Sequence, residues 1–211
     1  MAAGFGAFGK MPSVGDFFRI NAPVGFVRLW DGWLQQVLLS GQQTHGSAFD
    51  SNYMSAPIWR FSLPAGLAGP EKLTGVLMPS VDRVGRRFPL TLMVPLATPG
   101  PAALDHFCDT WLFDQLEVIA LAALEDSMTQ DRLSSALAAI AVPDIRAVAP
   151  LRAAGNNLVL TGAGSTDDLP DAMAAALLDD RAPDASLWTA VLDSGPRMMV
   201  CRGLPQGNAA L

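Results

Sequence analysis

The spacing of apolar residues changes along the chain, and each spacing indicates one type of element. From residue 24 to 40, apolar positions such as Val27, Trp30 and Leu34 recur every three or four residues, which predicts an amphipathic helix. Three later apolar runs are short and separated by Gly- and Pro-containing connections, which predicts strands. Connections this short favour antiparallel neighbours, because a parallel return needs a crossover of about a dozen residues. These strands are expected at 57–63, 73–78 and 88–94.

Helical and strand-like spacings alternate in the rest of the chain. A broad apolar stripe that includes Leu104, Trp111 and Val118 predicts one long helix over residues 102–125. A second helix is expected over 131–140, because Pro143 cannot continue it. Together these patterns predict an α+β fold, with helices packed on a mostly antiparallel sheet. The remaining expected elements are a strand at 4–11, helices at 47–53 and 170–178, and strands at 157–161, 186–192 and 197–202.

Composition favours a folded, soluble chain. Half of the 211 residues are hydrophobic and 16% are charged, so a sizeable core can form and disorder is excluded. No apolar run reaches the roughly 18 residues of a membrane helix, and the N-terminus lacks a secretory leader. We therefore expect a cytoplasmic protein without direct membrane insertion. Residues 1–211 are expected to form a single compact domain, with a motif-rich part at 1–96 and a mixed second half at 97–211 that can stand as a second lobe.

Charge is distributed unevenly between these two parts. Residues 1–96 carry eight Lys or Arg and five Asp or Glu, a net charge of +3. Residues 97–211 carry six and fifteen, a net charge of −9, and the two values sum to the total of −6. A nucleic-acid-binding domain usually has a dense basic face and an isoelectric point above about 9. The isoelectric point here is near 4.7, so nucleic acid is excluded as the expected partner.

The residues that could carry chemistry do not form a known catalytic or metal-binding pattern. The chain has two histidines, His45 and His106, and neither shows metal-ligand spacing to the other or to a cysteine. The stretch Gly4-Phe-Gly-Ala-Phe-Gly9 fits the dinucleotide fingerprint by letter, but no strand precedes it and Pro12 follows where a helix should run. We therefore expect no enzyme activity, no catalytic residue, no metal and no cofactor.

Three arginines close together form the main candidate site. Arg83, Arg86 and Arg87 lie within five residues, and Gly85 between them allows a tight turn. The planar guanidinium group suits carboxylates and phosphates, so the cluster could contact a partner protein or an anion. The alternative is that these side chains are used inside the fold. Their internal partners would then be Asp82, Asp16 or the ring of Trp59.

Several ordered stretches resemble the TagF family, also called ImpM, of accessory proteins of bacterial type VI secretion systems. They are Gly6-Ala-Phe-Gly-Lys-Met-Pro-Ser-Val-Gly-Asp-Phe17, Trp30-Asp-Gly-Trp-Leu34, Tyr53-Met-Ser-Ala-Pro-Ile-Trp-Arg-Phe61 and Gly75-Val-Leu-Met-Pro-Ser-Val-Asp-Arg-Val-Gly-Arg-Arg-Phe-Pro-Leu-Thr91. Four blocks within the first 91 residues make the resemblance specific, whereas the second half is only weakly diagnostic.

The resemblance implies a non-catalytic, post-translational repressor of secretion-system assembly or firing that acts by protein contact. The partner it implies is a forkhead-associated-domain scaffold protein of the same system. The alternative function is a small-molecule, nucleotide or phosphate sensor that uses the arginine loop. The residues that match the family's motif positions, as candidates for binding a partner or an anion, are Asp16, Trp59, Arg60, Asp82, Arg83, Arg86 and Arg87.

Overall fold

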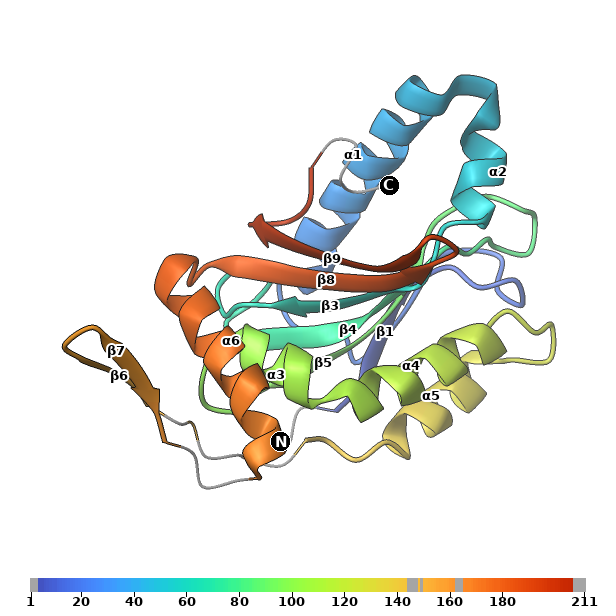
Figure 1. The fold of residues 1–211 in the computed structure, drawn as a ribbon. Coiled ribbons are helices and arrows are strands. Elements are labelled where there is room, and N and C mark those ends of the chain that lie inside the picture. Colours follow the sequence, from blue (N-terminus) through green and yellow to red (C-terminus); the bar gives the residue numbers. More distant parts are fainter. Residues whose placement is uncertain (1–3, 144–147, 149, 162–164, 207–211) are drawn as a thin grey trace.

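The computed structural model describes residues 4–143, 148, 150–161 and 165–206, and its centre is one seven-stranded sheet (Figure 1). Every strand in this sheet pairs antiparallel with its neighbours, in the order β2-β1-β5-β4-β3-β8-β9. The predicted α+β class with a mostly antiparallel sheet is therefore confirmed. The strands are β1 (Gly6–Gly9), β2 (Phe18–Ile20), β3 (Trp59–Leu63), β4 (Lys72–Met78), β5 (Leu90–Leu96), β8 (Ala185–Leu192) and β9 (Gly195–Arg202).

Helices cover both faces of the sheet and make three layers (Figure 1). One face carries α1 (Phe26–His45), a 3-10 turn (Gly46–Ala48) and α2 (Phe49–Met54). The opposite face carries α3 (Ala102–Cys108), α4 (Thr110–Ala122), α5 (Gln130–Ala138) and α6 (Leu169–Arg181). No helix within the described ranges is long and apolar enough to cross a membrane.

An aromatic cluster fixes α1 to its face of the sheet. The Trp30 ring lies 5.0 Å from Phe61 and 6.0 Å from Trp188 between ring centroids, so α1 contacts both β3 and β8. The indole N–H of Trp30 donates to the Thr91 hydroxyl on β5 at 2.8 Å, which satisfies the polar atom of a fully buried side chain. The helical spacing of apolar residues in the sequence therefore marks the buried side of α1.

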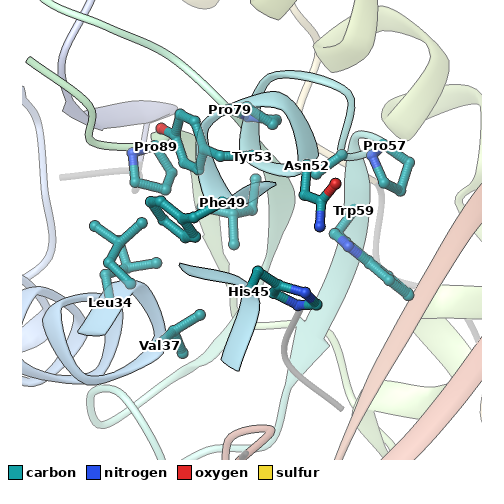
Figure 2. Close-up of a pocket in the computed structure, with 13 residues that line it drawn as sticks. Leu34, Val37, His45, Phe49, Asn52, Tyr53, Pro57, Trp59, Pro79 and Pro89 are labelled. Atoms are coloured by element: carbon teal, nitrogen blue, oxygen red, sulfur yellow. The ribbon is translucent and has the colours of Figure 1, made fainter. Parts of the chain in front are cut away.

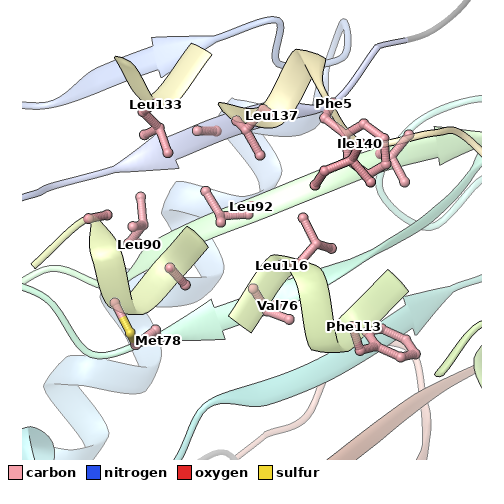
Figure 3. Packing of buried hydrophobic residues seen from close by; sticks show 14 of the residues in the cluster. Phe5, Val76, Met78, Leu90, Leu92, Phe113, Leu116, Leu133, Leu137 and Ile140 are labelled. Atoms are coloured by element: carbon pink, nitrogen blue, oxygen red, sulfur yellow. The ribbon is translucent and has the colours of Figure 1, made fainter. Parts of the chain in front are cut away.

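An aliphatic core fills the opposite face, under α4 and α5 (Figure 3). Val76, Leu90 and Leu92 point from β4 and β5 toward Leu116 of α4 and Leu137 of α5. Because successive side chains of a strand alternate between the faces, β4 and β5 supply apolar groups to both cores. The two strands are consequently buried along nearly their whole length.

The helix expected over residues 102–125 is two helices, so that prediction was wrong. The backbone leaves the helical conformation at Asp109, with φ −99° and ψ 37°, and α4 starts at the next residue. α3 packs against α6 and α4 packs against β4, so the break lets each half follow a different part of the sheet. Asp109 is buried within an apolar stripe, and stripe periodicity alone gives no signal for such a bend.

The second half of the chain completes the same sheet. β8 pairs with β3, with Phe61 opposite Trp188, and β9 pairs with β8 over its full length. The expected second lobe is therefore not formed by these strands. The sequence also missed β2 and the strand β6 (Leu151–Ala154), which pairs with β7 (Asn157–Leu160) in a hairpin beside the main sheet (Figure 1).

A buried histidine links α3 to the sheet. The two ring nitrogens of His106 each lie 3.0 Å from a hydroxyl, one on Ser62 of β3 and the other on Thr189 of β8. Burial, with a smaller contribution from the positive charge of Arg60, lowers the pKa of His106 from 6.5 to about 4. The imidazole is therefore neutral in the folded protein at neutral pH.

This histidine should make stability depend on pH. Between pH 6.5 and about 4 the unfolded chain binds a proton at His106 that the folded chain does not. The stabilisation is therefore complete above pH 6.5 and falls as the pH decreases toward 4, by up to about 3 kcal/mol. Urea titrations across this range should show a loss that His106→Gln reduces and that His45→Gln, at an exposed histidine, leaves in place. Equal pH slopes for wild type and His106→Gln would contradict this assignment.

Candidate functional site

Two loops meet at one edge of the sheet and form what we call the double-loop surface, residues 10–17 and 79–89. β1 and β4 both pair with β5 in the antiparallel sense, so they run parallel to each other and the loops that follow them leave the sheet at the same edge. The backbone N–H of Arg83 donates to the carbonyl of Val14 at 3.0 Å, and the guanidinium of Arg86 donates to the carbonyl of Gly15 at 2.7 Å. These bonds hold the two loops together.

The Asp82 carboxylate organises the longer loop. Its side chain is inaccessible to solvent and accepts from the Lys10 ammonium at 2.9 Å and from Arg86 Nε at 2.6 Å. The backbone N–H groups of Val84 and Arg86 donate to its other oxygen at 3.0 and 2.9 Å. Four donors therefore saturate one buried carboxylate and fix the loop around it.

These contacts also determine the charge of Asp82. Burial opposes ionisation, but the hydrogen bonds from Lys10, Arg86 and Val84 outweigh it and hold the pKa of this carboxyl well below its usual range. Asp82 is therefore ionised throughout the physiological pH range, and the network is intact there. It serves as an anchor for the loop and has no free oxygen lone pair pointing to solvent for proton transfer.

Two glycines make the tight geometry possible. Gly85 closes a turn through its N–H to the Asp82 carbonyl at 2.9 Å and has a φ of 82°, a region that favours glycine. Gly9 has a φ of 138°, and a side chain there would clash with the carbonyl of Pro89. Gly85, which the sequence was expected to use for a tight turn, therefore lies where the tip reverses, and Gly9 lies where β1 closely approaches Pro89.

The three arginines of the cluster have different environments. Arg86 is bound to Asp82 and Gly15, as described above, and Arg87 pairs with Asp50 of α2 at 2.6 Å. Arg83 is exposed, lies against Gly15 and forms no side-chain hydrogen bond or ion pair with any described residue. Two of the three are thus used inside the fold, through Asp82 and Asp50, and one is available for a partner.

Apolar groups lie beside the available arginine. Val84 at the tip is 71% exposed, and Phe17 of the neighbouring loop is 48% exposed. The Phe17 ring packs edge-on against Phe88 with centroids 4.7 Å apart, and the Lys10 ammonium lies 4.8 Å from its centre. Asp16 is also exposed, and its carboxylate accepts the N–H of Phe17 at 2.8 Å. The double-loop surface therefore combines ordered apolar groups with a basic tip.

Trp59 and Arg60 lie elsewhere, although the sequence placed them in the same candidate set. They are neighbours on β3, so they point to opposite faces of the sheet. Arg60 binds Glu117 at 2.6 Å and Asp114 at 2.7 Å on α4, and the hydrogen bond to Glu117 is the main cause that raises its pKa. Trp59 lies under α1 and α2, and its stacking on the arginine loop, one of the alternatives above, does not occur.

The sequence missed two residues that hold this surface. Lys10 is buried and meets Asp82 across 72 positions of the chain, and only the pairing of β1 with β5 brings them together. Tyr53 of α2 donates its hydroxyl to the Ser80 carbonyl at 2.8 Å and accepts the Ser80 N–H at 3.0 Å. Burial raises the pKa of Tyr53, so this phenol stays neutral. Within the described ranges, no group of three or more His, Cys, Asp or Glu could hold a metal ion.

The fold and these loops define an α+β protein with a rigid, partly apolar and partly basic surface at one edge of its sheet. Residues 6–140 match the family model described as the TagF N-terminal domain, type VI secretion system-associated. This match spans more than half of the chain, and the chain belongs to that family. The double-loop surface and both helical layers that support it lie within the matched residues, except for α6.

A solved structure is similar over nearly the whole chain. The crystal structure of PA0076 from Pseudomonas aeruginosa PAO1 is 32% identical in sequence and superposes with a TM-score of 0.77. The similarity covers 98% of this chain and 91% of PA0076, so it includes α6, β8 and β9 beyond the family match. A search of curated proteins found no match.

Proposed function

We propose that this TagF-family protein is a non-catalytic repressor of type VI secretion-system assembly or firing, which acts in the cytoplasm by protein contact. The partner is expected to be a forkhead-associated-domain scaffold protein of the same system. The observation that carries the proposal is the exposure of Arg83, Val84 and Phe17 on loops that the buried Asp82 network holds in place.

A rigid surface of this composition suits binding. Loops that are already ordered lose little conformational entropy when a partner binds, so more of the contact energy appears as affinity. Arginine and aromatic residues are enriched where interfaces gain most of their binding energy. Arg83 at the tip favours an acidic patch on the partner, and complementary charges raise the association rate more than the affinity.

The same arginines give less support to a nucleotide or phosphate sensor. A phosphate-binding site usually has several guanidinium or ammonium groups that donate hydrogen bonds to the same anion. Here Arg86 and Arg87 are bound to Asp82 and Asp50, and only Arg83 lacks a partner within the described part of the chain. Releasing either pair to bind a ligand would cost an existing contact, so protein contact is the better-supported function.

Genetics tests the repressor role. Deleting the gene in the bacterium that encodes it should raise the amount of secretion-system tube protein in the medium, and a plasmid copy should restore repression. A repressor that acts by contact should work in proportion to its amount relative to the partner, whereas an enzyme would work at much lower amounts. Unchanged or reduced secretion in the deletion strain would contradict the proposal, and full repression at far below one chain per partner would contradict the non-catalytic mechanism.

A further inference from the structure

A pocket of about 260 Å³ lies between α1, α2 and the sheet, next to the double-loop surface, with which it shares Pro79 and Pro89 (Figure 2). Most of its wall is apolar. Figure 2 shows side chains from α1, α2 and the loop ends on one side of the pocket. These side chains are Leu34, Val37, Phe49, Pro79 and Pro89.

Three polar side chains gather on the other side of the pocket. His45, Asn52 and Trp59 face it together, and the nitrogen-bearing edge of Trp59 lies beside Asn52 (Figure 2). The fourth polar group of the wall, the hydroxyl of Tyr53, is already bound to Ser80 as donor and acceptor. The pocket therefore has a polar end and an apolar end.

The indole N–H of Trp59 is the most informative of these groups. Trp59 as a whole is only 7% exposed, but its indole nitrogen stays accessible from the pocket and has no hydrogen-bond partner among the described residues. The indole nitrogens of Trp30, Trp33 and Trp188, which are also buried, each donate to an oxygen within the fold. An accessible indole N–H can donate to water or to an acceptor on a bound molecule. The N–H of Trp59 is therefore available to a group that enters the pocket.

The chemistry of the wall defines that group. Trp59 can only donate a hydrogen bond, and the Asn52 amide and the His45 imidazole can each donate as well, so the entering group is an acceptor. The lining contains no Lys, Arg, Asp or Glu. A charged head would lose its hydration without gaining a counter-ion, so a neutral acceptor fits better. A ligand with a carbonyl group and an apolar chain can contact the polar end with the carbonyl and the apolar end with the chain.

We propose that this pocket binds a small neutral acyl compound, with an amide or ester carbonyl accepting the Trp59 N–H and an apolar chain against Leu34 and Phe49. The volume agrees with this class, since pockets for drug-sized ligands span about 300–1,000 Å³ and this one is slightly smaller. A small molecule also reaches a side chain that is 7% exposed more easily than a peptide carbonyl, which carries chain on both sides. The proposal does not depend on the partner contact.

The Trp59 indole resonance gives a direct test with octanamide as the probe. In ¹⁵N-labelled protein, Trp59→Phe assigns the resonance, and octanamide should shift it saturably with a Kd below about 1 mM. Trp59→Phe keeps the apolar ring and removes the donor, so calorimetry should show binding weakened about fivefold. Trp111→Phe is the matched control, because Trp111 lies on α4 at the opposite face and should leave the affinity unchanged.

Three results would overturn the proposal. The first is no saturable shift of the Trp59 resonance at millimolar octanamide, and the second is equal affinity for wild type and Trp59→Phe. The third is tighter binding of octanoate than of octanamide, which would show that the pocket prefers a charged ligand over a neutral one. If a secretion-system protein shifts the Trp59 resonance and octanamide does not, the occupant is a segment of that protein and the small-ligand assignment is wrong.

Discussion

Replacing Arg83 by Glu together with Val84 by Asp should abolish capture of the partner while leaving the protein folded. Both side chains are exposed at the tip of the double-loop surface, and neither contributes its side chain to the Asp82 network. Residues that dominate an interface each contribute about 2 kcal/mol or more, so the double variant should bind at least about 100-fold more weakly. Calorimetry with the purified forkhead-associated-domain scaffold protein measures the affinity, and secretion should rise as in the deletion strain.

The controls for this experiment separate binding from folding. Arg28→Glu with Val118→Asp changes the same residue types at exposed positions on α1 and α4, and should leave the affinity near that of wild type. Both double variants should melt close to wild type, because surface substitutions usually change stability by less than about 0.5 kcal/mol. Arg86 is left intact because it also binds Asp82. If the folded Arg83→Glu, Val84→Asp protein binds the partner with wild-type affinity, the double-loop surface is not the contact surface.

Asp105→Ala should be among the most destabilising substitutions in the chain. The Asp105 carboxylate is buried, accepts from the Lys72 ammonium at 2.6 Å and accepts the Thr98 hydroxyl at 2.8 Å. The substitution leaves the Lys72 charge buried with the Gly100 carbonyl as its remaining hydrogen-bond acceptor among those observed. Removing one partner of a buried ion pair costs about 3–5 kcal/mol. Urea unfolding should therefore show a lower midpoint with an unchanged m-value.

Two further variants test whether the loss of stability in Asp105→Ala comes from the unpaired Lys72 charge. Asp126→Ala removes an exposed carboxylate and should change the free energy of unfolding by less than about 0.5 kcal/mol. Lys72→Met combined with Asp105→Leu replaces the pair by apolar groups and should recover most of the stability, because such replacements are often neutral. A loss below about 1 kcal/mol in Asp105→Ala would show that Lys72 finds solvent or another partner.

Elements with strong local signals were predictable from the sequence. The helix expected over 24–40 is α1, Phe26–His45, and the three expected central strands are β3, β4 and β5 in the expected antiparallel arrangement. For α1 the spacing of apolar residues marks the buried side, and for the strands the short apolar runs mark their extent. β2 has three residues and β6 is largely exposed, so neither produces a periodic apolar pattern that sequence reasoning can detect.

The candidate site was only partly predictable, because its contacts join distant positions. The Arg83–Arg87 segment is a loop with a tight glycine turn, as expected. The carboxylates that bind Arg86 and Arg87 are Asp82 and Asp50, and no local pattern pointed to Asp50. Trp59 and Arg60 were grouped with the loop by motif, whereas strand alternation sends them to opposite faces. Phe17 is a candidate contact residue only in the folded structure, where its loop is hydrogen-bonded to the loop that carries Val84.

Site-specific photo-crosslinking can show whether the double-loop surface contacts the partner. A photoreactive residue at Val84 and one at Val118 offer a matched pair, since the two valines are 71% and 67% exposed on different surfaces. In cells that express the type VI secretion-system proteins, we expect a crosslink from position 84 to a cytoplasmic component of that system, the forkhead-associated-domain scaffold, and none from position 118. A crosslink to that component from position 118 and none from position 84 would contradict this expectation.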